Sequence, residues 1–252
     1  MSSWAVITGA SSGLGEAFTR HLAATGSDVV LVARNEQAMR KIAAEVERAH
    51  NVQTMVVPTD LADGAQRAGL IGKLDELEVH TLVNNAGFGT LGRLAELERG
   101  RISDEIEVNV TALTELSHAV IPQMLQRDRG AIVNVASTAA FQPVPEMATY
   151  AATKSYVLNF SNALWGELRG TGVRVVCICP GPTETGFFEN LGDESVMSNR
   201  RRPQDVIATT FRALDKRQPY AVDGARNKLL AQAGRFVPTT LALRIANWVA
   251  TH

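Results

Sequence analysis

Residues 4–15 read WAVITGASSGLG, an apolar run that passes directly into a glycine-rich turn. The run WAVIT is typical of a buried strand, and the residues after the turn are typical of a helix. Glycine permits positive φ and lets a phosphate approach the backbone closely, while the start of a helix offers free N–H groups and the positive end of its dipole. The stretch therefore predicts a strand–turn–helix unit that holds a phosphate group.

The glycine spacing narrows the kind of phosphate site. It is G-x-x-x-G-x-G, not the G-x-G-x-x-G of the commonest dinucleotide fingerprint, and no Gly-Lys-Ser/Thr follows as it does in a P-loop. An ATPase is therefore disfavoured, and a plain glycine-rich turn is the structural alternative. The residues that we expect to contact a cofactor phosphate are Gly9, Ser11, Ser12, Gly13, Leu14 and Gly15.

The turn belongs to a repeating pattern that extends along most of the 252 residues. Short β-branched runs alternate with helical stretches, and strands that are apolar on both faces imply a parallel sheet covered on both sides. We predict an α/β fold with one doubly wound, Rossmann-type parallel sheet flanked by helices on both faces, in a single domain over 1–252. The expected strands are 4–8, 28–33, 53–57, 80–84, 131–136 and 173–179, and the expected helices are 13–25, 35–50, 62–77, 101–127 and 149–169.

The pattern weakens after about residue 180. Residues 182–203 are polar and broken by Gly and Pro, and a loop of that length is usually functional, so we expect a substrate loop there. A helix over 203–216, a short strand near 219–222 and a helical tail over about 224–252 should follow. Two aromatics, Phe187 and Phe188, could cover an apolar substrate or simply pack as core. The run Arg200-Arg201-Arg202 could meet a phosphate group or form a solvated cluster.

Composition excludes several classes of function. The net charge of −1 gives no basic field for nucleic acid, and no run approaches the ~18 apolar residues of a membrane span. The N-terminus lacks the pattern of a secretory signal, so we expect a cytoplasmic protein. Cys177 and Cys179 alternate along one strand, where they are poor disulfide partners and too few ligands for zinc. We interpret them as core thiols and expect no metal site.

The end of the second strand bears on the choice of cofactor. Arg34 follows this strand at the place where an acidic residue would bind the ribose of NAD, and an arginine there would pair with the 2′-phosphate of NADP. NADP(H) is therefore preferred over NAD(H), although Glu36 could reach a ribose hydroxyl if the loop folded differently. After the third strand, Asp60 and Leu61 could flank the adenine, or Asp60 could simply cap a helix.

Tyr150 and Lys154 lie four residues apart in a stretch typical of a helix, and Ser137 lies thirteen residues before Tyr150. Residues i and i+4 share a helix face, so the phenol and the ammonium should be neighbours. A cation at ~4 Å with an effective dielectric of ~20 favours the phenolate by roughly 4 kcal/mol, and burial opposes that shift. We predict a net lowering of the Tyr150 pKa and a proton-transfer site. The alternative is an exposed helical pair.

Taken together, these motifs resemble the short-chain dehydrogenase/reductase family over roughly residues 4–185. The matching pieces occur in the family's order: Thr8-Gly-Ala-Ser-Ser-Gly-Leu-Gly15, Asn84-Asn-Ala-Gly87, Asn109, Ser137, Tyr150-Ala-Ala-Thr-Lys154, and Pro180-Gly181 with Thr185. The resemblance implies an NADP(H)-dependent oxidoreductase that transfers a hydride between the nicotinamide and a carbonyl or secondary alcohol, with an apolar substrate favoured.

The resemblance also implies a role for each matching residue. Ser137 would hold the substrate oxygen, Tyr150 would give or take the proton, and Lys154 would bind the nicotinamide ribose. Asn109 would hold a water of the proton relay. The adenosine half would lie against Asn85, Ala86 and Gly87, and the nicotinamide end and the pyrophosphate against Pro180, Gly181, Thr183 and Thr185.

Two further functions on the same fold stay open. One is a catalytically idle NADP-binding sensor or scaffold, which need not keep Asn109, Ser137, Tyr150 and Lys154 together. The other is an epimerase or dehydratase, whose relatives often carry a larger substrate domain. The family resemblance implies a homodimer or homotetramer, although the tail departs from the short ending of many tetrameric relatives. Contact of the tail with a membrane is disfavoured, since residues 236–252 hold one Arg and no Lys.

Overall fold

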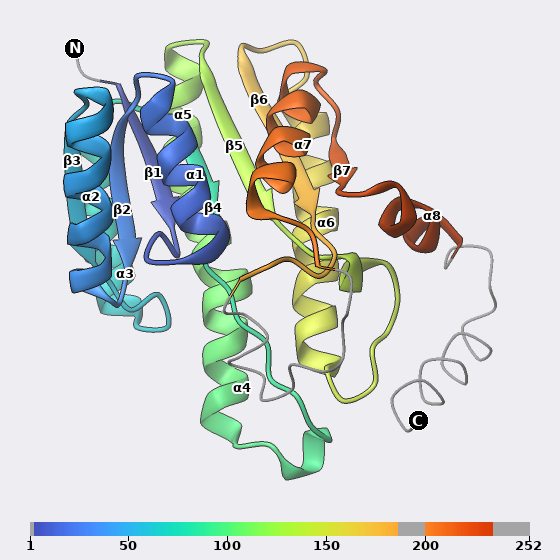
Figure 1. Ribbon diagram of the computed structural model, residues 1–252. Coiled ribbons are helices and arrows are strands. Elements are labelled where there is room, and N and C mark those ends of the chain that lie inside the picture. Colours follow the sequence, from blue (N-terminus) through green and yellow to red (C-terminus); the bar gives the residue numbers. More distant parts are fainter. Residues whose placement is uncertain (1–2, 186–199, 234–252) are drawn as a thin grey trace.

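The computed structural model describes residues 3–185 and 200–233, and a seven-stranded sheet forms its centre (Figure 1). Every pair of neighbouring strands is parallel, and the order is β3-β2-β1-β4-β5-β6-β7. The fold prediction is confirmed, and each predicted strand lies within one residue of its observed bounds. The strands are β1 Trp4–Thr8, β2 Asp28–Ala33, β3 Thr54–Pro58, β4 Val79–Asn84, β5 Gly130–Val135, β6 Val173–Cys179 and β7 Tyr220–Val222.

The helices also follow the predicted pattern, with one difference. The helix expected over 101–127 consists of α4, a π-helical segment at Glu107–Ala112, and α5. The sequence pattern gave no sign of this segment or of the short 3₁₀ turns at Leu94–Glu96 and Thr138–Phe141. The helices are α1 Gly13–Ala24, α2 Glu36–His50, α3 Gly64–Asp75, α4 Arg99–Ile106, α5 Leu113–Gln126, α6 Ala148–Glu167, α7 Pro203–Asp215 and α8 Ala225–Ala233.

Both faces of the sheet are covered. On one face, α1, α2 and α7 pack over side chains such as Ile7 of β1, and Figure 1 shows α1 and α7 in front of the sheet. On the other face, α3, α5 and α6 pack over side chains such as Val6. Successive strand residues point to opposite faces, so both faces must be apolar, as the sequence indicated. Cys177 and Cys179 are buried free thiols, which confirms their interpretation as core residues.

The strand order changes direction between β1 and β4, and Thr8 ties these two strands together where they end. Its Oγ1 accepts hydrogen bonds from the N–H groups of Asn85 (3.0 Å) and Ala86 (2.9 Å), and donates to the carbonyl of Val83 (3.3 Å). Ligands of doubly wound sheets bind at such a switch point, outside the carboxyl ends of the strands. This hydroxyl therefore sets the distance between the glycine turn after β1 and the loop after β4.

A buried polar chain fixes the helices behind the site. Asn84 Nδ2 donates to Asn134 Oδ1 (2.9 Å) and to Ser117 Oγ (3.0 Å), and Asn134 Nδ2 donates to Ser161 Oγ (2.9 Å). These bonds join β4, β5, α5 and α6 in the interior. Asn84 Oδ1 has no hydrogen-bond partner among the described residues, but the other bonds still favour one arrangement of these elements, because a shift would leave further buried polar groups unpaired.

Much of the predicted substrate loop and tail lies outside the described residues, including Phe187 and Phe188 and positions 234–252. The two ends of the loop meet in a parallel bridge between Thr183 and Arg201. None of the helices in the described part of the chain is long and apolar enough to cross a membrane.

The glycine turn should tolerate very little added volume. A Cβ on Gly15 would lie 2.0 Å from the carbonyl oxygen of Gly9, whereas a Cβ on Gly72, inside α3, would meet nothing within 4 Å. We expect Gly15→Ala to lower the free energy of unfolding by about 1–3 kcal/mol, and the control Gly72→Ala to raise it by about 0.5–1 kcal/mol. Urea denaturation measures both, and equal effects of the two substitutions would contradict this reading of the turn.

Candidate active site

The first turns of α6 carry Tyr150 and Lys154 into the protein interior. The residues are 8% and 4% exposed, and Lys154 Nζ lies 5.7 Å from the centroid of the Tyr150 ring. The predicted neighbourhood is confirmed, and the alternative of an exposed pair is wrong. The main reason is that this part of α6 packs over the end of β5, where Lys154 Nζ donates a hydrogen bond to the carbonyl of Val135 (2.9 Å).

Ser137 reaches the same place from the other direction. It follows β5 with an extended backbone and caps the 3₁₀ turn Thr138–Phe141, accepting a hydrogen bond from the N–H of Ala139 (3.1 Å). Its side chain also lies close enough to Tyr150 to lower the pKa of the phenol. The structure thus brings together two hydroxyl groups that are thirteen residues apart in sequence.

The protonation of this pair differs from the prediction. Burial raises the pKa of Tyr150 to about 12, outweighing the opposite influence of the Ser137 hydroxyl, and burial lowers the pKa of Lys154 to about 8. The predicted lowering of the phenol pKa is wrong because desolvation exceeds the attraction of a nearby cation. Tyr150 is consequently a neutral phenol in the protein without ligand, and so a proton donor.

Asn109 lies in the π-helical segment and holds the loop after β4. Its Oδ1 accepts from the N–H of Phe88 (3.1 Å), and its Nδ2 donates to the carbonyl of Phe88 (2.9 Å) and to Thr153 Oγ1 (3.0 Å). The side chain therefore connects this loop to α6. Short π-helical segments are frequent at functional sites. The role of Asn109 in a water relay stays a prediction, since both amide hydrogens are already used.

The loop after β4 passes so close to α6 that it needs glycine. A Cβ on Gly87 would lie 2.9 Å from Asn109 Oδ1 and 3.1 Å from Lys154 Nζ, and a Cβ on Gly89 would lie 3.0 Å from the Tyr150 ring. Together with Asn85 and Ala86, these residues line the switch point beside the glycine turn.

The glycine turn has the features that a pyrophosphate requires. Gly9 and Gly13 have φ of +66° and +56°, which favour glycine. Ser12 precedes α1, but its side chain makes no capping hydrogen bond, so it does not block the free N–H groups of the first turn. A Cβ on Gly13 would lie 3.1 Å from the side chain of Thr185, so the segment after β6 crosses this turn. These residues fit the phosphates of a dinucleotide.

The segment after β6, residues 180–185, is anchored by hydrogen bonds. The carbonyl of Pro180 accepts from the N–H of Thr138 (2.9 Å), and the carbonyl of Gly181 accepts from the hydroxyl of the buried Thr183 (2.9 Å). The structure therefore brings the predicted phosphate and nicotinamide ends of the cofactor site side by side.

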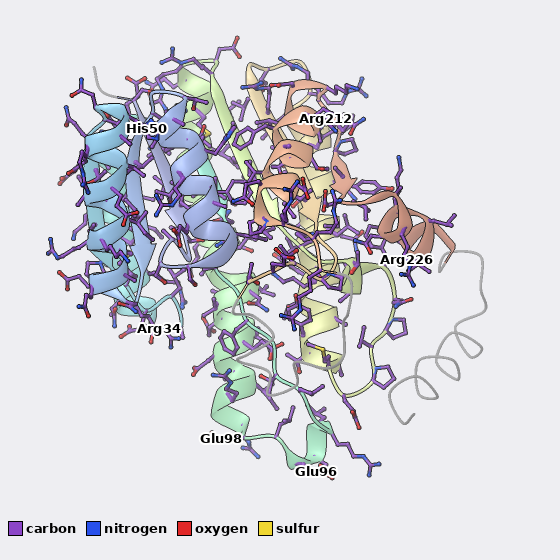
Figure 2. The ribbon with its side chains drawn as sticks, viewed as in Figure 1. Arg34, His50, Glu96, Glu98, Arg212 and Arg226 are labelled. Carbon is purple, nitrogen blue, oxygen red and sulfur yellow. The ribbon has the colours of Figure 1, made fainter. Side chains whose placement is uncertain are left out.

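Arg34 is exposed where β2 ends, and Figure 2 shows it at the opposite end of α2 from His50. Among the residues described, it makes no ion pair. Asn35 caps α2 by accepting from the N–H of Ala38 (3.0 Å), and Glu36 is paired with Arg40 one turn along. Glu36, which could have bound a ribose, is thus paired with another residue. The Arg34 guanidinium is the charged group at the end of β2 that is available to a cofactor.

Asp60 and Leu61 follow β3, but Asp60 does not cap a helix. The cap of α3 is Asp63, which accepts from the N–H groups of Ala65 and Gln66, so that alternative is wrong. Asp60 instead accepts from the N–H of Ala62 (3.0 Å), and Leu61 is buried. Both residues remain predicted contacts of the adenine.

Comparison with known proteins decides the family. A model described as short chain dehydrogenase matches residues 3–195. The chain belongs to this family. It is 39% identical over 176 residues to the very-long-chain 3-oxoacyl-CoA reductase of Laccaria bicolor, covering 68% of this chain and 52% of that protein. It is 32% identical over 180 residues to the inactive hydroxysteroid dehydrogenase-like protein 1 of Homo sapiens, covering 70% and 54%. The chain spans about half the length of these curated relatives.

A solved short-chain dehydrogenase from Sphingobium yanoikuyae, in complex with NADPH, has a TM-score of 0.84 and 31% identity to this chain. The match covers 93% of this chain and 94% of that one. The likeness thus extends well beyond the residues of the motifs, to nearly the whole dehydrogenase fold.

Two buried charged residues of the present chain, Arg67 and Glu105, were not predicted from the sequence. Arg67 of α3 is buried, donates to the carbonyl of Leu61 (2.8 Å) and pairs with Glu107 (2.8 Å) and Glu115 (2.9 Å). It therefore holds the turn that would face the adenine. Its signal was present, because Arg67 shares the apolar face of α3 with Leu70 and Leu74. The second missed residue, Glu105, carried no such signal.

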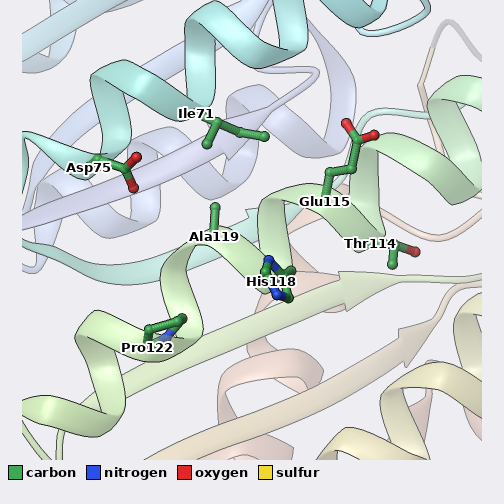
Figure 3. A pocket seen from close by; sticks show the side chains of 7 residues that line it. All are labelled: Ile71, Asp75, Thr114, Glu115, His118, Ala119 and Pro122. Atoms are coloured by element: carbon green, nitrogen blue, oxygen red, sulfur yellow. The ribbon is translucent and has the colours of Figure 1, made fainter.

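The arginine cluster and an open hollow between two helices lie apart from the predicted site residues. Arg201 pairs with the buried Asp223 (2.8 Å) and Arg202 with Asp205 (3.2 Å), which favours a structural role for both. An open hollow of about 490 Å³ lies between α3 and α5, where Figure 3 shows Ile71 and Asp75 facing His118 and its neighbours. It contains none of the predicted site residues.

The buried Lys154 should leave a measurable mark on stability. Its pKa of about 8 lies below the ordinary 10.5, so the folded state is penalised below pH 8 and the penalty disappears as the pH rises to 10.5. Lys154→Met should raise the free energy of unfolding by an amount on the order of 3 kcal/mol at pH 7, and by much less at pH 10.5. Urea denaturation at both pH values measures this difference. A pH-independent difference would contradict the burial of a charged amine.

Proposed function

We propose that this protein is an NADP(H)-dependent oxidoreductase that interconverts a carbonyl compound and the corresponding secondary alcohol. The observation that carries the proposal is the half-buried Ser137 beside the buried Tyr150 and Lys154, close enough to influence the pKa of the phenol. Both residues lie near the carboxyl ends of the strands, at the same edge of the sheet as the glycine turn. Two hydroxyl donors aimed at one oxygen, next to a dinucleotide site, suit carbonyl reduction.

A bound nicotinamide cofactor would supply the hydride. The chain would hold it through the N–H groups of the Gly9–Gly15 turn, Asn85–Gly87 and the Pro180–Thr185 segment. Ser137 and Tyr150 would bind the carbonyl oxygen and stabilise the charge that develops there. Tyr150 would then donate its proton, because a phenol whose pKa is near 12 retains its proton at neutral pH. Lys154 would bind ribose hydroxyls and keep the phenol oriented.

The preference for NADP(H) rests on Arg34. Its guanidinium is exposed, while Glu36, the alternative ribose partner, is paired with Arg40. A guanidinium binds a phosphate in a bidentate manner, whereas an adenosine ribose without the 2′-phosphate offers it no charge to neutralise. The NADPH in the related Sphingobium yanoikuyae enzyme agrees with this cofactor class.

A catalytically idle cofactor-binding protein is the second candidate. It is favoured by the likeness to a human relative that is described as inactive. The buried Tyr150 and Lys154, with Ser137 beside them, argue against it, because a protein without turnover has no need to bury a lysine beside a phenol at the expense of stability. Cofactor binding without turnover on a broad carbonyl and alcohol panel would support it.

The proposal extends to the substrate, the oligomeric state and the location of the protein. An apolar substrate agrees with the reductases among the relatives. A homodimer or homotetramer is supported by exposed apolar side chains on the outer helices, namely Ile106, Leu125 and Tyr156, and light scattering of the purified protein distinguishes these states. A cytoplasmic location is supported by the two buried free thiols.

Removing the Tyr150 hydroxyl tests the mechanism. We expect Tyr150→Phe to lower kcat for NADPH oxidation with a carbonyl substrate by about 10²–10⁴-fold, while the Kd for NADPH stays close to that of the wild type. The control is Tyr156→Phe, a more exposed tyrosine on the same helix, which should retain full turnover. Unchanged turnover of the Tyr150 variant would disprove the assigned proton donor.

Removing the Arg34 guanidinium tests the cofactor preference. Arg34→Ala should weaken NADPH binding by roughly 10–100-fold, since it removes a charge-assisted hydrogen bond, and should leave NADH binding nearly unchanged. The control Arg48→Ala removes an exposed arginine from the last turn of α2, away from Glu36, and should alter neither. Fluorescence titration with both cofactors gives the Kd values. Tighter NADH than NADPH binding in the wild type would overturn the preference.

A further inference from the structure

Glu105 is the most unusual buried group outside the residues already assigned. It lies in the last turn of α4, one helical turn before Asn109, and has no exposed surface. Neither of its carboxylate oxygens has a hydrogen-bond partner in the described part of the protein, and the same holds for the nearby Thr90 Oγ1. A buried carboxyl without a hydrogen bond is strongly destabilising, so its presence calls for a reason other than packing.

The groups around Glu105 belong to the active site. Lys154 and Tyr150 interact with it electrostatically from α6, and Arg101 does so from the preceding turn of α4. Thr90 lies against it from the loop after β4, at a geometry that falls short of a hydrogen bond. Burial is the largest influence on the Glu105 carboxyl and raises its pKa, while Thr90, Arg101 and Lys154 oppose that rise.

The loop between these helices links them mechanically as well. Asn109 hydrogen-bonds both backbone groups of Phe88, and Arg101 lies 4.4 Å over the Phe88 ring. On the other side of the loop, Gly87 packs on Lys154 and Gly89 on the Tyr150 ring. Glu105 and Asn109 are four residues apart, on one helical face, so both side chains approach this loop from the same side.

We propose that Glu105 is a positioning residue of the active site, which acts through the Phe88–Thr90 loop and through its charge to set the protonation of the Tyr150–Lys154 pair. An anion here favours the ammonium form of Lys154 and disfavours the phenolate of Tyr150. Glu105 thus keeps the phenol as an acid and the lysine as a cation. This inference rests on the proposed function only in the use made of the Tyr150 proton.

The test compares Glu105→Gln, which keeps the shape and removes the charge, with Asp104→Asn, which removes an exposed acid from the adjacent position. The first measurement is the pH profile of kcat for alcohol oxidation, in which Tyr150 must accept a proton. Glu105→Gln should displace the rising limb toward lower pH by roughly half a unit or more, giving about threefold faster oxidation at a fixed pH on that limb. Asp104→Asn should leave the profile unchanged.

The second measurement does not need turnover. The chain has three tyrosines, so phenolate absorbance in the wild type minus that of Tyr150→Phe isolates Tyr150 during an alkaline titration. These pH values lie above the range in which even buried glutamates titrate, so Glu105 is ionised there. Onset of Tyr150 ionisation at lower pH in the Glu105→Gln background is the expected result. An unchanged onset would refute the role of Glu105, whether or not the protein proves to be an oxidoreductase.

A third variant separates this role from a merely structural one. Glu105→Leu should melt at the same temperature as the wild type or higher, because it removes an unpaired buried carboxyl, and should still show the displaced pH profile. A destabilised Leu variant with an unchanged profile would show that Glu105 serves packing alone and would overturn the proposal.

Discussion

The hydroxyl of Thr8 is the contact on which the geometry of the site depends. It sits at the carboxyl end of β1 and takes hydrogen bonds from two successive N–H groups of the loop after β4. The carboxyl ends of β1 and β4, between which the strand order reverses, are thereby held at a fixed separation. The glycine turn follows Thr8, and Gly87 follows the residues that Thr8 binds. The glycine turn and the loop beside Tyr150 are consequently positioned by one side chain.

Desolvation, rather than charge pairing, sets the chemistry of Tyr150 and Lys154. A cation at contact distance would lower a phenol pKa by roughly three units at an effective dielectric of ~20, yet the pKa rises to about 12. The ammonium donates to the carbonyl of Val135, and both side chains are almost completely buried. Such a pair is unfavourable for folding, and the hydrogen bonds that join Asn84 and Asn134 to the helices behind the site help to offset this cost. Hydrogen bonding in the core thus compensates for the unfavourable burial of Tyr150 and Lys154.

Most of the fold could be predicted from the sequence because its signals are local. A strand buried on both faces shows itself as a short apolar run. A phosphate-binding turn shows itself as glycines at G-x-x-x-G-x-G spacing. Each signal lies within a few consecutive residues. The order of the motifs identified Ser137 and Tyr150, which the structure then placed next to each other. What could not be predicted depends on distant contacts. The π-helical segment at Asn109 arises where the helix must meet both Phe88 and Thr153, and Glu105 is buried only because α4 packs against α6.

The same distinction explains the errors made from sequence. Asp60 and Asp63 are both plausible caps for α3, and only the observed start of the helix chooses Asp63. The sign of the Tyr150 pKa shift depends on how much water the fold removes, which no spacing of residues reveals. A family motif therefore fixes which side chains meet, whereas the surrounding burial fixes their protonation. In this protein, the protonation of Tyr150 and Lys154 is set in the narrow space between α4 and α6, where the glycines at positions 87 and 89 allow the loop to pass.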